Sequence, residues 1–158
     1  MSWNLRRVFH KLKGMERHSI LALLDFSPVT SDVLDWADRE AAQSESELLL
    51  LHVAGANDPM RQRPPVLMTD VMDDSVRRCW RTPQGHIAAM VREGEDAVDE
   101  ISTVASLYDC GMICMGRGGT SERPGHVARG VGRRFAGKTY WVKQAPADTC
   151  PEAAYVSA

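Results

Sequence analysis

The chain has 158 residues, which is the length of one domain with a sizeable core. Hydrophobic residues make up 44% and charged residues 25%, a balance that argues against a disordered or fibrous protein. The formal net charge of −2 gives the whole chain no nucleic-acid signature. We therefore expect a compact globular protein that does not bind nucleic acid.

The four cysteines are spaced in a way that favours neither a zinc site nor a redox pair. They are Cys79, Cys110, Cys114 and Cys150, and none belongs to a C-x-x-C pattern. We interpret them as reduced thiols, so the expected location is cytoplasmic. No apolar run approaches the roughly 20 residues that span a bilayer, and the basic N-terminus has no apolar signal-peptide core.

The first elements of the chain are predicted from hydrophobic periodicity. Residues 3–13 have the spacing of an amphipathic helix with a basic outer face. A buried strand over 19–24 follows, and a helix capped by Thr30 or Ser31 extends to about residue 42. A second buried strand is predicted at 48–53, followed by a proline-rich loop over 54–66.

The second half of the chain continues the alternation of helices and strands. The predicted elements are a weaker helix at 68–79, a turn at 82–85, a strand at 86–91, a helix at 96–107 capped by Asp96, a strand at 112–115, a helix at 126–135 and a strand at 139–143. This alternation predicts an α/β fold with an open, doubly wound five-stranded parallel sheet and an extra N-terminal helix. The expected domains are 1–16 for that helix, 17–146 for the α/β unit and 147–158 for a loose tail.

Glycines follow the strand at 112–115 directly and point to a ligand site. That strand ends in Gly116, with Gly119 soon after, and a second glycine, Gly125, precedes a predicted helix. Glycine lets the backbone approach a ligand closely, and the free N–H groups of a helix N-terminus favour an anion. In open α/β sheets ligands bind at this edge. The pattern indicates a nucleotide or phosphate pocket, although such turns also occur without a ligand.

Residues 132–139, GRRFAGKT, match the phosphate-loop pattern G-x-x-x-x-G-K-[ST]. A genuine phosphate loop follows a strand and opens a helix, whereas here a helical stretch precedes the pattern and a strand-like stretch follows it. We therefore interpret the segment as the end of a helix. In that interpretation Arg133, Arg134 and Lys138 complement the helix dipole, and Gly137 is the C-cap glycine.

Taken together, the segments resemble the universal stress protein family, whose fold is of the adenine nucleotide alpha-hydrolase-like type. The resemblance covers about residues 17–146 and is carried by four segments: 20–27, 47–53, 91–94, and 115–119 with 125–128. It implies a five-stranded sheet and a homodimer joined through the last strand, 139–143. In the nucleotide-binding branch it also implies an ATP site.

The resemblance also implies roles for particular residues. Asp25 would lie near the ribose and phosphates, and Val53 would offer backbone groups to the adenine. The branch motif is G-x2-G-x9-G-[ST]; Gly116 and Gly119 fit its first half, but Gly125 comes after only five residues and His126 replaces the hydroxyl residue. Arg117 and Arg123 would then compensate by binding phosphate.

Three functional hypotheses remain open at this point. The first is a cytosolic regulatory protein that binds ATP with Mg²⁺, or another adenine nucleotide, without fast turnover and without an assigned catalytic residue. The second is a relative that has lost the pocket and acts as a protein-interaction module, as the short loop and His126 favour. The third, a phosphate-loop enzyme using 132–139, is disfavoured by context. The N-terminal helix is expected to dock on a protein partner, with a membrane surface as the alternative.

Overall fold

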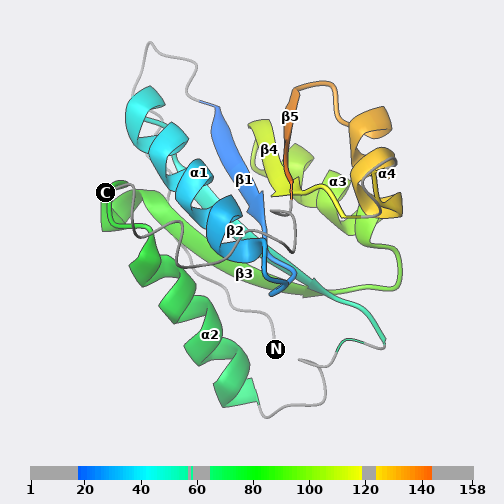
Figure 1. Cartoon of the computed structure of the whole chain (residues 1–158), viewed down its shortest axis with the longest axis horizontal. Helices are drawn as coiled ribbons and strands as arrows, with labels where there is room; N and C mark the ends of the chain where they lie inside the picture. Colours follow the sequence, from blue (N-terminus) through cyan, green and yellow to red (C-terminus); the bar gives the residue numbers. More distant parts are fainter. Residues whose placement is uncertain (1–17, 57, 59–64, 119–123, 144–158) are drawn as a thin grey trace, which may run out of the picture.

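The computed structural model describes residues 18–56, 58, 65–118 and 124–143. The predicted N-terminal helix and C-terminal tail lie outside these residues. Five strands alternate with four helices, and one short 3-10 helix precedes the third strand (Figure 1): β1 Ser19–Leu23, α1 Thr30–Ser44, β2 Leu48–Ala54, α2 Pro65–Arg78, η2 Gln84–His86, β3 Ile87–Glu93, α3 Ala97–Leu107, β4 Cys110–Gly116, α4 His126–Arg134 and β5 Lys138–Val142.

The sheet is parallel throughout, with the strand order β3-β2-β1-β4-β5. The chain builds outward from β1 to β3, then returns to pair β4 with the other side of β1. The order of strands therefore reverses between β1 and β4, and at such a point the helices on either side cross to opposite faces. This confirms the predicted open, doubly wound five-stranded sheet.

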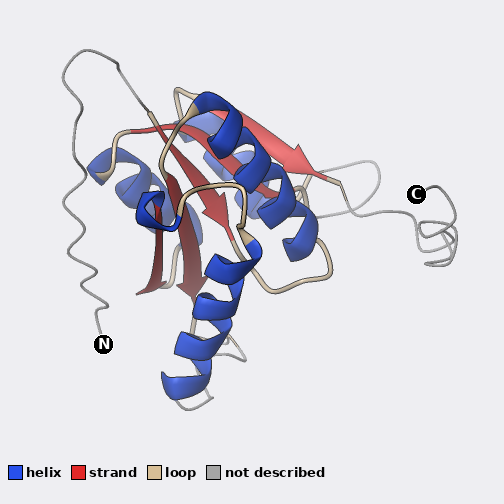
Figure 2. Ribbon diagram, turned by 90° about the vertical axis from the view of Figure 1, so that its left-hand side faces the viewer, coloured by secondary structure: helices blue, strands red, loops and turns tan. Residues whose placement is uncertain are grey.

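Alternate residues of each strand pack on opposite faces of the sheet. Ile20 and Ala22 of β1 join the core beneath α1 and α2, while Leu21 joins the core beneath α3 and α4. Figures 1 and 2 show these two pairs of helices on the two sides of the sheet. Both faces of the sheet are covered, so Leu48 to Leu51 of β2 are all apolar and buried. This is the continuous apolar run from which the strand was predicted.

Several predicted boundaries shift in the structure. The N-cap of α1 is Val29 without a side-chain hydrogen bond, so the predicted caps Thr30 and Ser31 are wrong. The hydroxyl of Thr30 instead donates to Asp25 Oδ1 at 3.1 Å. The predicted cap Asp96 is confirmed, since its side chain accepts from the backbone N–H of Asp99. A helix begins at Pro65, so the loop predicted through residue 66 is shorter.

A buried carboxylate joins α1 to the segment that follows α2. Asp38 is fully buried, and its two oxygens accept hydrogen bonds from the backbone N–H groups of Arg81 at 3.0 Å and Thr82 at 2.8 Å. The guanidinium of Arg81 lies 3.5 Å from the same carboxylate. These bonds compensate the loss of hydration of the carboxylate and fix the path into β3. No helix in the described part of the chain is long and apolar enough to cross a membrane.

Candidate functional site

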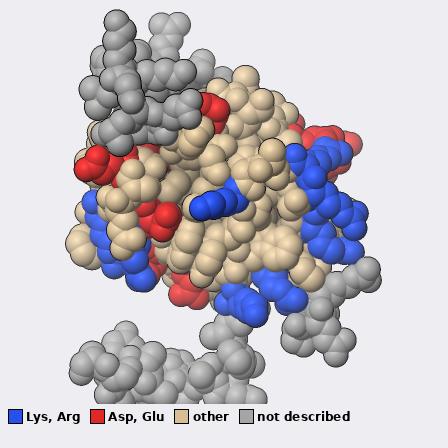
Figure 3. Space-filling model, turned by 90° about the horizontal axis from the view of Figure 1, so that it is seen from above, with Lys and Arg blue, Asp and Glu red and all other residues tan. Residues whose placement is uncertain are grey.

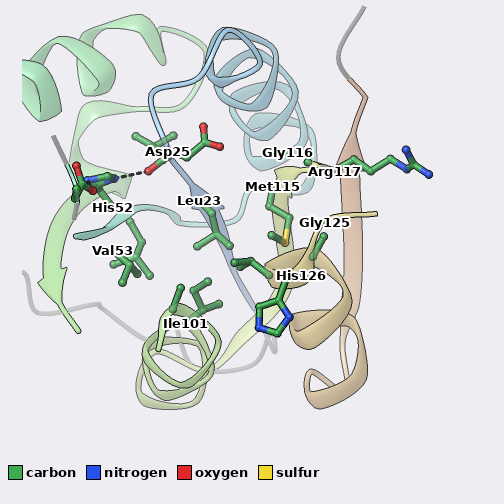
Figure 4. A pocket seen from close by; sticks show the side chains of 17 residues that line it. Leu23, Asp25, His52, Val53, Ile101, Met115, Gly116, Arg117, Gly125 and His126 are labelled. Atoms are coloured by element: carbon green, nitrogen blue, oxygen red, sulfur yellow. Dashed lines mark hydrogen bonds and ion pairs between the residues drawn. The ribbon is translucent and has the colours of Figure 1, made fainter. Parts of the chain in front are cut away.

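A cavity of about 360 Å³ opens at the carboxyl edge of the sheet, where the strand order reverses. Its walls come from the ends of β1, β2 and β4 and from the first turns of α3 and α4 (Figure 4). This volume lies within the range of small-molecule sites, and the position is the one where open α/β sheets bind ligands. Gly116, which ends β4, and Gly125, which directly precedes α4, both line the cavity.

Apolar side chains form the middle of the cavity. Leu23 of β1, Val53 of β2, Met115 of β4 and Ile101 of α3 all face it, and Figure 4 shows them around one hollow. They belong to the core face beneath α3 and α4, or pack against it. A flat apolar group such as an aromatic base fits such walls, because most of its surface leaves water there.

Asp25 stands just beyond β1 at one end of the cavity. Its Oδ1 accepts two hydrogen bonds, from the backbone N–H of Ser27 at 3.0 Å and from the hydroxyl of Thr30 at 3.1 Å. These bonds fix the carboxylate in the turn, while the residue as a whole stays exposed. Asp25 therefore lines the cavity and also holds the turn that follows β1.

The opposite end of the cavity is formed by the N-terminus of α4. The first helical hydrogen bond runs from Arg129 N–H to the carbonyl of Gly125, so the N–H groups of residues 126–128 have no acceptor within the helix. Gly125 is the N-cap and supplies no side-chain bond. The partial positive charge of the helix N-terminus thus faces a cavity whose other end carries a carboxylate.

The remaining predicted residues fall in different places. Val53 and Arg117 line the cavity, but the Arg117 side chain extends away from the other labelled residues in Figure 4. His126 is the first residue of α4, lines the cavity and is exposed. Gly119 and Arg123 lie outside the described residues. The structure therefore brings together six of the eight predicted residues around one cavity: Asp25, Val53, Gly116, Arg117, Gly125 and His126.

Two polar residues of the cavity were not predicted as site residues. His52 is buried in β2 and hydrogen-bonded to the carbonyl of Leu24. Asp58 was assigned only to a loop, yet it lines the cavity and its Oδ2 lies 2.8 Å from His52 Nε2. The available signal was a histidine inside an apolar strand with an acid six residues later.

The buried cysteines behave as small apolar residues. Burial raises the pKa of the Cys110 and Cys114 thiols to about 12, with the nearby Asp109 carboxylate adding to the effect at Cys110. Cys79, Cys110 and Cys114 are all free thiols. Cys150 lies outside the described residues. Across the described ranges no three histidine, cysteine or acidic side chains gather in a group that would hold a metal ion.

The phosphate-loop pattern at 132–139 has the wrong structural context. Its first residues end α4, and Lys138 and Thr139 begin β5. Arg133 and Arg134 occupy the last turn of α4, and Figure 3 shows Lys and Arg side chains gathered on this side of the molecule. Arg133 and Arg134 therefore suit the helix dipole as predicted, but the same prediction is wrong for Lys138, which lies beyond the end of α4 in β5. The predicted C-cap is wrong, because α4 ends at Arg134 and Phe135 is its C-cap, not Gly137.

The decisive comparison is with protein families. A model described as the universal stress protein family matches residues 16–141. The chain belongs to the universal stress protein family. The match covers the five strands and four helices of the sheet almost completely, so the resemblance noted in the sequence is confirmed.

Solved structures of the universal stress protein family share the fold. One from Burkholderia pseudomallei is 25% identical, with 82% of this chain and 98% of the other covered, at a TM-score of 0.59. A universal stress protein in complex with cAMP is 18% identical, covers 82% and 98%, and has a TM-score of 0.64. One from Archaeoglobus fulgidus in complex with dAMP is 19% identical, covers 82% and 100%, and has a TM-score of 0.63.

These likenesses extend across the α/β unit of this chain. The latter two relatives, below 25% identity, are evidence for the fold alone. A comparison with curated proteins finds no significant match.

Proposed function

We propose that this universal stress protein binds an adenine nucleotide in the cavity at the carboxyl edge of its sheet. The observation that carries the proposal is the polarity of the cavity. It has apolar walls, the carboxylate of Asp25 at one end and, at the other, the first N–H groups of α4, which have no acceptor within the helix. A nucleotide carries the three kinds of group that these features would bind: a flat base, hydroxyls that donate hydrogen bonds, and a terminal anion.

The polarity also gives the orientation of the ligand. The ribose hydroxyls would donate to Asp25, the base would pack between Val53 and the apolar walls, and the phosphate would accept from the start of α4. The family relatives described in complex with cAMP and dAMP support a ligand of this class. Where ATP is the ligand, we expect Mg²⁺ to accompany its phosphates, and turnover to be slow in a regulatory protein.

A homodimer is part of the same proposal. Strand β5 is an edge of the sheet, so one side of its backbone has no strand partner among the described residues. Two copies joined through residues 139–143 would cover that edge. Sedimentation of the full chain tests this, with a dimer mass expected and a monomer at tens of micromolar contradicting it.

A second function, a protein-interaction module without nucleotide, is favoured by one feature of the α4 end. His126 stands where the nucleotide-binding branch has a hydroxyl residue, and only five residues separate Gly119 from Gly125. In that case the cavity would be a remnant, and the N-terminal segment would bind a protein partner or a membrane surface.

Displacement of a fluorescent adenine nucleotide tests the proposed function. We expect ATP or AMP to displace it from the parent, and Asp25→Ala to weaken binding about tenfold by removing a charge-assisted acceptor. Asp32→Ala is the matched control, since Asp32 is an exposed acid on α1 away from the cavity lining. Equal affinity for the parent and Asp25→Ala contradicts the assigned orientation, and no binding to the parent favours the interaction module.

A further inference from the structure

One buried histidine contacts both sides of the cavity that are assigned to the base and the ribose. His52, in β2, is 3% exposed. Its Nδ1 lies 2.6 Å from the carbonyl oxygen of Leu24, which follows β1. A carbonyl oxygen only accepts, so Nδ1 carries the hydrogen and donates it. This bond spans residues that are 28 positions apart in the chain.

The other ring nitrogen faces the loop after β2. His52 Nε2 lies 2.8 Å from Oδ2 of Asp58, at an ion-pair distance but without hydrogen-bond geometry. The Asp58 side chain is 14% exposed, so water screens this contact little. Figure 4 shows the imidazole at the edge of the cavity, with the dashed line running to the Leu24 oxygen. The ring thus joins β1, β2 and the following loop.

The same imidazole packs against a turn with an unusual backbone. Phe26, directly after Asp25, has φ of 58°, a left-handed conformation that is rare for a bulky residue. The ring centroids of Phe26 and His52 are 4.8 Å apart, tilted by 52°. Such a conformation costs on the order of 1 kcal/mol or more and persists where surrounding contacts determine it. Both contacts of His52 with this segment, at Leu24 and Phe26, flank the carboxylate of Asp25.

We infer that His52 is the positioning residue of the base end of the cavity, and this inference rests on the proposed function. By holding the Leu24 carbonyl and the Phe26 ring, it fixes the Asp25 carboxylate on one wall. His52 also lies next to Val53 and contacts Asp58, and in this way it fixes the wall formed by β2 and the loop that follows it. The pairing of β1 with β2 and the 2.8 Å bond from Leu24 N–H to the Leu51 carbonyl set the spacing of the strands, and His52 sets the position of the residues beyond them that the base would contact.

Two substitutions of His52 each retain one contact of the ring, with Leu24 or with Asp58, and remove the other. The amide nitrogen of His52→Asn takes the place of Nδ1 and retains the Leu24 bond, but the side chain is too short to reach Asp58. The amide nitrogen of His52→Gln takes the place of Nε2 and retains the Asp58 contact, but loses the Leu24 bond. Asp58→Asn, at a partly accessible position, alters one partner without changing the buried ring. Circular dichroism and thermal melting establish that each variant is folded.

The probes are adenosine, AMP and ATP, titrated into each folded variant at one temperature. We expect His52→Gln to weaken all three by the same factor, about tenfold, because the base end is common to them. His52→Asn and Asp58→Asn should weaken all three by a smaller common factor. Gly125→Asp is the contrasting variant: its effect should be absent with adenosine and increase with the number of phosphates, since it acts at the α4 end.

The outcomes separate this inference from the proposed function. A merely structural histidine would lower the melting temperature of His52→Gln and leave its affinity for AMP unchanged; that result overturns the inference while the proposed function stands. A factor that grows with the number of phosphates also overturns it, because the effect would then lie at the other end. Absence of AMP and ATP binding to the parent removes the proposed function and the inference together.

Discussion

The backbone N–H of Gly125 donates a hydrogen bond of 3.0 Å to the carbonyl of Arg117, which joins the two ends of the loop between β4 and α4. Arg117 is itself held by its N–H, which donates to the carbonyl of Val142 in β5 at 2.8 Å. The start of α4 is therefore fixed relative to the sheet by described backbone bonds alone. The N-terminus of α4, where we propose that an anion binds, is thus held in place although the loop is shorter than the family motif.

Substitution of the α4 N-cap tests that end of the cavity directly. Gly125 has φ of −64° and ψ of 165°, which any residue adopts, and it supplies no cap of its own. In both Gly125→Asp and Gly125→Asn the new side chain should cap α4 and stabilise the fold by roughly 0.3 kcal/mol. The Asp variant should also lose at least about tenfold in AMP affinity, because a carboxylate occupies and repels the phosphate position.

The Asn variant is the matched control, since it has the same shape without the charge. Urea denaturation gives the stabilities, and equilibrium titration gives the affinities. If Gly125→Asp binds AMP as tightly as Gly125→Asn does, the phosphate does not lie at the N-terminus of α4.

For the phosphate-loop pattern at 132–139 we predict that a substitution leaves the affinity for ATP unchanged. Lys138 is exposed and pairs with Met112, four strand positions before Gly116, so it lies about 13 Å from the cavity edge. We expect Lys138→Ala to bind ATP with the affinity of the parent, measured by equilibrium dialysis. A loss of tenfold or more would restore the phosphate-loop interpretation that the fold argues against.

Removal of the Asp38 carboxylate should destabilise the fold. Asp38→Ala leaves the buried backbone N–H groups of Arg81 and Thr82 without their acceptors, which should lower the free energy of unfolding by about 2–4 kcal/mol. Asp35→Ala, three residues earlier, removes a carboxylate whose side chain is half exposed and should cost less than about 1 kcal/mol. Urea denaturation compares them; similar losses would mean that burial of Asp38 is not what matters.

Because burial raises the pKa of the thiols, we expect the free energy of unfolding to fall at alkaline pH. Burial raises the pKa of Cys114 from 9.0 to about 12. The folded state therefore retains a proton that the unfolded state releases, so this contribution is fully present below pH 9 and declines between pH 9 and pH 12. Between pH 8 and pH 10 the free energy of unfolding of Cys114→Ala, measured by urea denaturation, should fall by about 1 kcal/mol less than that of the parent. An identical decline in both proteins would contradict the assigned pKa.

The order of elements was predictable because the strands are buried on both faces. Leu48 to Leu51 and Ile20 to Leu24 read as continuous apolar runs, and the alternation with helices left few parallel topologies. The placement of Gly116 and Gly125 at one edge followed from the same reasoning, since ligands bind at the carboxyl edge of such sheets, whereas the placement of Asp25 there came from the family resemblance.

The contacts between distant segments were not predictable from periodicity. Gly130 lies within the helix predicted at 126–135, where helix propensity alone makes a glycine unfavourable. In the structure a Cβ at Gly130 would lie 2.7 Å from a methyl group of Val98, so the glycine permits the close approach of α3 and α4. The pairing of His52 with Leu24 and Asp58 likewise depends on the strand register rather than on local composition. The end of α4 was mispredicted because Phe135 ends the helix without a glycine.

Calorimetric titration of the nucleotide-stripped full chain measures directly whether the cavity binds an adenine nucleotide. AMP and Mg-ATP are injected separately at 25 °C, with GTP as the control for selectivity of the base. We predict saturable binding of an adenine nucleotide with a micromolar Kd, corresponding to about −8 kcal/mol. Absence of heat, together with absence of competition at millimolar AMP and ATP, would contradict nucleotide binding in the cavity and leave the chain as a family member that works without this ligand.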